Sequence, residues 1–153
     1  MKKFKFTLQT VHNVREIKQE KELLILSELQ AEAAKAADRI KEIEQLRSKA
    51  IENYARRLES GRAIDPYELE LNSNHISALD RLQREAQKTL EMRKQACSRQ
   101  SKTVEAAVRE VKITKRLRET QQARYQLEAG RQEQNNLDEL VSANYARQMS
   151  QSK

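Results

Sequence analysis

One break divides an otherwise uninterrupted run of helix-forming residues. The chain has 153 residues with only two glycines and one proline, and Gly61 and Pro66 stand within six positions of each other. Glycine commonly ends an α-helix, and proline is tolerated at the first helical position. The segment between Gly61 and Pro66 is therefore predicted to be a turn between two long helices.

The residues around this break carry the signals of helix ends. Two arginines precede Gly61, where cations suit the carbonyl end of the helix dipole. Asp65 and Glu68 form an Asp-x-x-Glu capping box around Pro66. We expect the following segments: a first helix over about 7–60, a turn at 61–65, a second helix over about 66–145 and a frayed tail at 146–153.

Composition favours long helices over a compact core. Charged residues make up 35% of the chain, aromatic residues make up 4%, and tryptophan is absent. The mean hydropathy is -0.94. Such a profile is typical of coiled coils, and apolar residues spaced at helical intervals argue against disorder. A narrow apolar seam between helices is the expected core.

Each predicted helix has one apolar row whose members are alternately four and three residues apart, the spacing of a coiled-coil seam. On the first helix the row consists of Leu29, Ala33, Ala36, Ile40, Ile43, Ala50 and Tyr54, interrupted at Arg47. On the second it consists of Ile76, Leu79, Ala86, Leu90, Cys97, Val104, Ala107 and Val111, interrupted at Gln83, Arg93 and Gln100. The two rows are predicted to pack against each other.

The predicted fold is all-α, a long antiparallel two-helix coiled-coil hairpin that forms one rod-shaped domain. Folding the chain at about residue 63 places Ile40 near Ala86 and Leu8 near Arg118. Each row finds its partner within the same chain, so a monomer is expected. The second helix overshoots the first, and this overhang, weakened by Gly130, is where self-association would arise.

Catalytic and metal-binding patterns are missing from the sequence. There is no glycine-rich phosphate loop, and carboxylates alternate with lysine and arginine as on a solvated helix face. Cys97 is the only cysteine and is expected to be a small buried hydrophobe, whereas His12 and His75 are expected at the surface or seam edge. We therefore expect no enzyme activity, no cofactor and no metal site.

Positive charge is concentrated near the predicted open end of the hairpin. The formal net charge is +7. The first cluster comprises Lys2, Lys3 and Lys5, and the second comprises Lys112, Lys115, Arg116 and Arg118. A basic end suits an acidic protein socket, anionic lipid or nucleic acid, and a merely solvated surface is the alternative.

The two ends of the chain resemble the flagellar export protein FliJ family. Residues 2–22, KKFKFTLQTVHNVREIKQEKE, match its opening pattern, although His12 and Asn13 replace the more usual Leu and Asp. Residues 137–145, LDELVSANY, are similar to its C-terminal Leu-Asp-Glu-hydrophobic segment. The resemblance implies a cytoplasmic component of the type III export apparatus, peripherally associated with the membrane at the flagellar base.

The resemblance also implies partners and their surfaces. Family members resemble the coiled-coil stalk of rotary ATPases and insert into the export ATPase hexamer by the end that carries the termini. Here the implied ATPase-binding residues are Phe4, Phe6, Leu8, Gln9, Val11, Leu137, Asp138, Glu139 and Leu140. A face after the turn, implied to bind the cytoplasmic domain of the export gate membrane protein, comprises His75, Leu79, Leu82 and Ala86. Because Leu79 and Ala86 also belong to the seam row, a core role is the alternative.

Two other functions remain open from the sequence. One is a nucleic-acid or membrane-surface binder that uses the basic end, although the chain has no aromatic platform or zinc pattern. The other is a scaffold or escort chaperone that holds partner helices along exposed apolar residues, with Leu117 and Leu127 as candidates.

Overall fold

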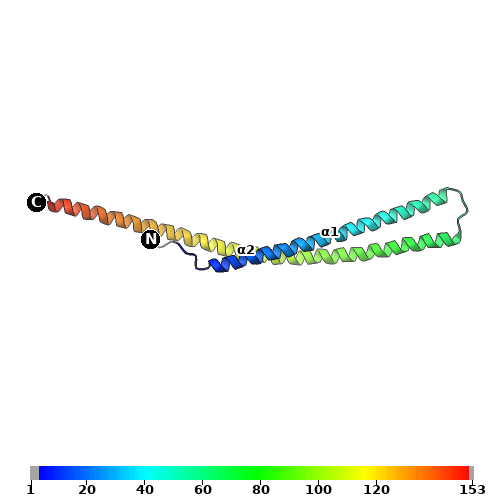
Figure 1. Cartoon of the computed structure of the whole chain (residues 1–153), viewed down its shortest axis with the longest axis horizontal. Coiled ribbons are helices and arrows are strands. Elements are labelled where there is room, and N and C mark those ends of the chain that lie inside the picture. The colour runs from blue at the N-terminus through cyan, green and yellow to red at the C-terminus, as the bar shows by residue number, and fades with distance from the viewer. Residues whose placement is uncertain (1–3, 152–153) are drawn as a thin grey trace. The chain divides into compact units, whose positions relative to one another are not determined.

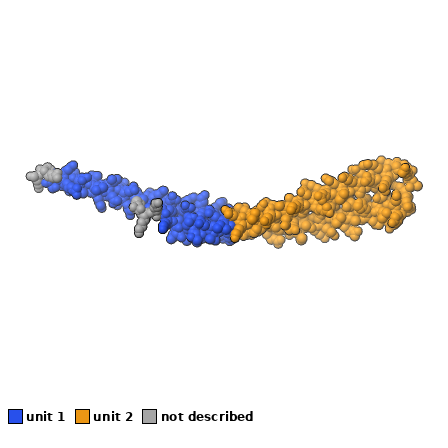
Figure 2. Space-filling model, viewed as in Figure 1, with its two compact units in different colours: residues 1–19, 107–153 blue, residues 20–106 orange. Residues whose placement is uncertain are grey.

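The computed structural model describes residues 4–151, together with all their side chains except that of Gln151. Two helices, α1 (Gln9–Glu59) and α2 (Pro66–Gln151), pack antiparallel to each other (Figure 1). The described residues contain no strand, so the predicted all-α hairpin is confirmed. The chain divides into two compact units, one of residues 1–19 and 107–153 and the other of residues 20–106 (Figure 2).

The turn between the helices has the predicted chemistry. Gly61 adopts a φ of 64°, a left-handed conformation that glycine adopts without the steric cost of a Cβ atom. At the other side of the turn, the backbone N–H of Tyr67 donates to Oδ1 of Asp65 at 3.0 Å. Asp65 is thus the N-cap of α2 and Pro66 its first helical residue.

Only the Asp65 half of the expected capping box forms. Glu68, predicted to complete it, instead has its Oε2 atom 3.8 Å from Nη1 of Arg57 on α1. Arg57 stands in the last turn of α1, where it also suits the helix dipole. The carboxylate therefore bridges the two helices beside the turn rather than capping α2.

The core of the unit formed by residues 20–106 is the predicted seam. Ile43, Leu79 and Val104 are buried, with exposed fractions of 2%, 5% and 8%. The other predicted seam residues of this unit are half-buried: Leu29, Ala33, Ala36, Ile40, Ala50, Tyr54, Ile76, Ala86, Leu90 and Cys97. The row is thin, and the many alanines allow the two helices to approach closely.

The polar residues that interrupt the seam are paired across it. Nε of Arg47 lies 2.6 Å from Oδ1 of Asp80. The three interruptions on α2 are likewise paired: Gln83 donates to Glu44 at 3.2 Å, Gln100 donates to Glu22 at 2.6 Å, and Arg93 pairs with Glu32. These partners all fit the predicted register, in which Ile40 lies near Ala86.

The unit formed by residues 1–19 and 107–153 packs the start of α1 against the middle of α2. Its buried residues are Phe6, His12, Ala107 and Thr114. Nδ1 of His12 lies 2.8 Å from Oγ1 of Thr114. The expectation that His12 lies at the surface or seam edge is wrong, because the seam row continues backwards through residue 12 and buries the imidazole to 5% exposure.

In this unit α2 continues well past the last residue that the described N-terminal segment contacts. Helix α2 passes through Gly130 and ends at Gln151, beyond the expected end at Tyr145. A Cβ atom at Gly130 would meet nothing within 4 Å. The glutamine, glutamate, arginine and leucine residues nearby favour helix enough to offset the glycine's cost of about 1 kcal/mol. Likewise α1 begins at Gln9 rather than Thr7.

Candidate partner-binding surfaces

The N-terminal segment before α1 folds back onto α2. The ring of Phe4 packs on that of Tyr125 with centroids 5.6 Å apart and a tilt of 48°. Phe6 is buried to 8% exposure, which makes it part of the core of this unit. The segment is thus anchored by two aromatic side chains, one buried and one stacked.

A shallow hollow forms where this segment meets the two helices. Its lining comprises Phe4, Lys5, Phe6, Gln9 and Arg118. Three of the implied ATPase-binding residues are therefore brought together, and two cations stand among them. The hollow combines aromatic surface with positive charge, which suits an acidic and apolar partner surface.

Two further predicted residues lie at the start of α1. Leu8 is 38% exposed and Val11 is 42% exposed. They are three positions apart, so they lie on neighbouring parts of the surface. Their side chains remain available to a partner while Phe6 holds the segment in place.

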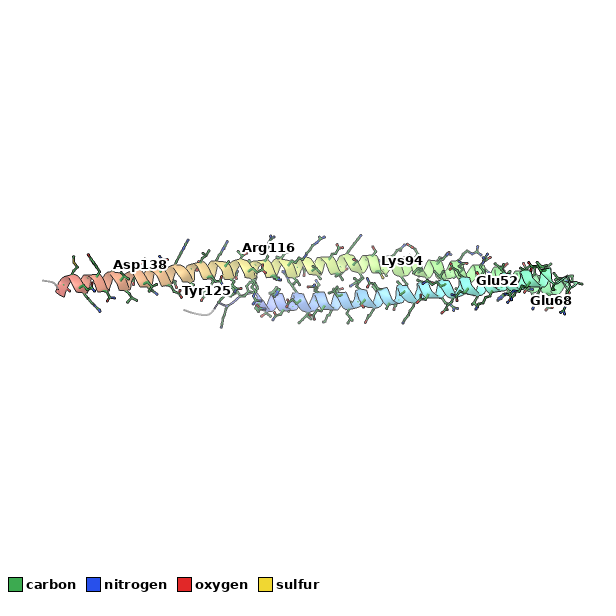
Figure 3. The ribbon with its side chains drawn as sticks, turned by 90° about the horizontal axis from the view of Figure 1, so that it is seen from above. Glu52, Glu68, Lys94, Arg116, Tyr125 and Asp138 are labelled. Atoms are coloured by element: carbon green, nitrogen blue, oxygen red, sulfur yellow. The ribbon has the colours of Figure 1, made fainter. Side chains whose placement is uncertain are left out.

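The C-terminal predicted residues lie on a separate part of α2. Leu137 and Leu140 are 61% and 62% exposed, and the carboxylates of Asp138 and Glu139 are also exposed. Leu137 is 12 positions beyond Tyr125, which corresponds to about 18 Å along the helix. Figure 3 shows its neighbour Asp138 further along α2 than Tyr125. The structure therefore does not bring these residues into contact with the N-terminal group.

Charge changes sign along this part of α2. Lys5, Lys112, Lys115, Arg116 and Arg118 are all exposed within this unit, whereas Lys2 and Lys3 lie outside the described residues. Between residues 126 and 151 the helix carries four carboxylates, Glu128, Glu133, Asp138 and Glu139, against two arginines, Arg131 and Arg147. The predicted basic end is thus a basic band followed by a mildly acidic helix end.

The implied gate face lies on α2 after the turn, in the unit of residues 20–106. His75 is exposed and Leu82 is 45% exposed, but Ala86 is half-buried. Leu79 is only 5% exposed and packs in the seam, so it cannot serve as an exposed contact of this face. The face that a partner could reach without unfolding the seam is therefore carried by His75 and Leu82.

Two residues of the N-terminal surface were not among the implied ATPase-binding residues, although Arg118 was predicted as part of the basic cluster. Tyr125 contacts Phe4, and Arg118 lines the hollow beside Phe6. The signal for both was present, because residues 118, 121 and 125 continue the three-four spacing of the seam row on α2. The escort candidates Leu117 and Leu127 are 38% and 66% exposed.

Among residues 4–151, no group of three or more histidine, cysteine or acidic side chains could hold a metal ion. Cys97 is a free thiol and is half-buried in the seam. Within the same described range, no helix is both long and apolar enough to cross a membrane.

Comparison with known proteins places the chain in a family. Searches of the curated proteins and of the solved structures found no match. The model of the flagellar FliJ protein family, in contrast, matches residues 4–150, which is nearly the whole chain. The match includes both helices, the turn and the exposed end of α2. Membership implies a role related to flagellar export, and the chain belongs to the flagellar FliJ protein family.

Proposed function

We propose that the protein is a cytoplasmic coiled-coil stalk of the flagellar type III export apparatus. In this proposal one unit binds the export ATPase hexamer and the other binds the cytoplasmic domain of the export gate. The family match supports the export role. The protein acts at the membrane at the flagellar base through these partners, and escorting export chaperones is a further part of the proposed role.

The observation that carries the ATPase assignment is the exposure of apolar residues at one end of α2. Leu137 and Leu140 are 61% and 62% exposed, although each is a large apolar side chain. Exposed apolar residues gathered along one segment commonly mark a protein interface. The basic band of the same unit would steer the protein toward an acidic socket and set its orientation, more than it would raise affinity.

The ATPase assignment is tested with Leu137→Ser combined with Leu140→Ser. Because both side chains are exposed, we expect helicity and melting temperature to stay unchanged while calorimetric affinity for the ATPase hexamer falls about tenfold or more. Met92→Ser is the matched control, since Met92 is 64% exposed on α2 but lies in the other unit. Full affinity in the double variant would refute the assignment of this end.

The gate assignment is tested with His75→Ala combined with Leu82→Ala. Both residues are exposed, so truncation should change stability by less than about 1 kcal/mol yet weaken binding of the gate domain. Leu69→Ala is the control, because Leu69 is 44% exposed, much as Leu82 is, and points to another side of α2. Equal gate affinity in all three proteins would remove this face from the proposal.

A further inference from the structure

The end of α2 carries a second row of residues at coiled-coil spacing that the hairpin does not use. Its members alternate in steps of four and three: Ala123, Leu127, Gly130, Gln134, Leu137, Val141 and Asn144. Tyr125, which belongs to the seam, is two positions from both Ala123 and Leu127, and two positions are about 200° around a helix. The second row therefore faces away from the seam that holds α1.

This second row is solvent-exposed throughout. The exposed fractions of Leu127, Leu137 and Val141 are 66%, 61% and 67%, and the other four members are exposed as well. Four of its seven members are apolar, namely Ala123, Leu127, Leu137 and Val141, and apolar residues at four-three spacing fit the knobs-into-holes packing of another helix. A partner helix of the same period is therefore the kind of occupant that this face suits.

Charge favours a second copy of this chain in antiparallel orientation. The segment with Lys112, Lys115, Arg116 and Arg118 is basic, whereas the carboxylates from Glu128 to Glu139 make the helix end acidic. In a parallel dimer, the basic segment of one copy would lie beside the basic segment of the other, and the two acidic segments would also lie side by side. Glu133 of one copy would flank Asp138 of the other. In the antiparallel register described next, Asp138 of each copy instead lies beside Arg124 of the other, so attraction replaces this repulsion.

In one antiparallel register, the second row of one copy packs against the same row of the other copy with apolar residues opposite each other. When Leu127 of one copy faces Leu137 of the other, Val141 faces Ala123, so that apolar residues meet apolar residues. The other row members form polar layers in the same register. Gln134 of one copy lies opposite Gly130 of the other, and Asn144 lies opposite Thr120. Glycine leaves room for the glutamine side chain to reach water, and the threonine hydroxyl can bond to the asparagine amide. No large apolar side chain of the row is left opposite a polar one.

The residues beside the row also complement each other in this register. Four flanking pairs form, each twice because the dimer is symmetric: Asp138 with Arg124, Arg147 with Glu119, Tyr145 with Leu117, and Leu140 with Gln126, which is neutral and contributes little. The first two are of opposite charge, and the third is apolar. The exposed fractions of Tyr145 and Leu117 in the single chain are 64% and 38%, so this contact would remove further apolar surface from water.

At the centre of the dimer, two charged residues each lie beside the same residue of the second copy, and this repulsion opposes association. Near the two-fold axis Arg131 flanks Arg131 of the second copy, and Glu133 flanks Glu133 of the second copy. Each of these like-charge pairs occurs once, whereas each attractive pair occurs twice. Because the core has only two leucine layers and Gly130 weakens the helix between them, the pairing is expected to be reversible.

We propose that residues 117–147 of two copies of this chain pair antiparallel as a reversible coiled-coil homodimer. The seam between α1 and α2 is left intact by this association. The proposal does not depend on binding to the export ATPase and is tested without it. Since Leu137 would serve both contacts, a second copy and the ATPase would compete for this end of α2.

The primary test is sedimentation equilibrium of the purified full-length chain over a wide concentration range. The average mass should rise from 17.9 kDa toward twice that value as concentration increases. Leu137→Asp combined with Val141→Asp should hold the mass at that of the monomer with unchanged helicity in the hairpin. Met149→Asp is the control, since Met149 is 60% exposed on α2 outside the row and its variant should associate as the native chain does.

A charge reversal tests the orientation. Asp138→Arg sets like charges at two flanking pairs of the antiparallel dimer and should weaken association about two- to tenfold. Adding Arg124→Asp restores opposite charges and should recover most of that loss. In a parallel dimer Asp138→Arg would instead remove the repulsion with Glu133 and tighten association, so the direction of the change distinguishes the two arrangements.

Disulfide trapping tests the register. Two preparations are made in a Cys97→Ser background, one carrying Leu127→Cys and the other Leu137→Cys, with tags of different size. On mild oxidation the mixture should form the crossed disulfide, because residue 127 of one copy faces residue 137 of the other. Each preparation alone should stay uncrosslinked, because two copies of either position lie about 15 Å apart along the axis.

Four results would overturn the proposal. They are a native chain that stays monomeric at every concentration, a dimer that survives the double aspartate substitution, a tighter dimer with Asp138→Arg, and disulfides that form within each cysteine preparation but not between them. Loss of ATPase binding alone, with self-association retained, would leave this proposal standing and would bear on the proposed function instead.

Discussion

Replacing Thr114 with valine measures how much one buried polar pair contributes to the free energy of unfolding. His12 and Thr114 are 5% and 3% exposed, and Nδ1 of His12 lies 2.8 Å from Oγ1 of Thr114. Oγ1 also lies 3.0 Å from the carbonyl oxygen of Val111. Nε2 of His12 lies 3.3 Å from Oε1 of Glu16, and a carboxylate only accepts, so we assign Nε2–H as the donor to Glu16 and Nδ1 as the acceptor of the Thr114 hydroxyl.

The expected magnitude follows from what the substitution leaves behind. Valine has nearly the shape of threonine, so Thr114→Val opens no cavity but leaves the buried Nδ1 of His12 without its donor. Such an unpaired buried polar atom costs about 1–3 kcal/mol. The double variant His12→Leu/Thr114→Val removes both polar groups together, and it also removes the pair of Nε2 with Glu16, whose side chain is 50% exposed and stays hydrated. Its free energy of unfolding should lie within about 1 kcal/mol of the native value.

The assay is urea unfolding followed by far-ultraviolet circular dichroism, for the native chain, both single variants and the double variant. The signature is that the double variant is more stable than Thr114→Val alone. Thr120→Val is the control, because the hydroxyl of Thr120 donates to the carbonyl of Arg116 at 2.9 Å but is exposed, and its loss should be nearly neutral. Additive effects of the two single substitutions would refute the reasoning.

Two other predictions concern glycine and the seam. Gly61→Ala should destabilise the protein by about 1 kcal/mol, because the φ of 64° strains an alanine. Gly130→Ala should stabilise it by about 1 kcal/mol, because that site is helical and has open space for a Cβ atom. Thermal melting curves of both variants measure the two opposite changes in stability. Ile43→Ala should cost about 2–5 kcal/mol because Ile43 is 2% exposed, while Leu46→Ala, at 51% exposed, should cost far less; urea titration of the two variants checks this contrast.

The fold could be predicted because its determinants are local and periodic. Gly61, Asp65 and Pro66 each favour one backbone state, so the turn was readable within a few residues. The four-three rows then fixed which faces meet, and the turn position fixed the register. The interruption at Arg47 belongs to this pattern too, since it faces Asp80 across the seam.

The sites were less readable because the family resemblance and the seam row assign some of the same residues to different roles. Leu79 and Leu82 are both leucines on α2 three positions apart, yet one is 5% exposed and the other 45%. The burial of His12 was also missed, although it lies on the backward extension of the seam row. A polar imidazole is expected at the surface unless a buried group forms a hydrogen bond with it, and Thr114 is that group here.

The paired polar residues of the seam between residues 20 and 106 have a mechanical consequence. If α1 were pulled lengthwise against α2, a slip of one heptad would take Arg47 away from Asp80 and set it opposite Ser73 or Gln87. The same slip would part Arg93 from Glu32 and Gln100 from Glu22. Each pair is weak alone, but all must break together before the helices slide. The seam therefore resists shear more strongly than its few buried leucines and isoleucines would suggest.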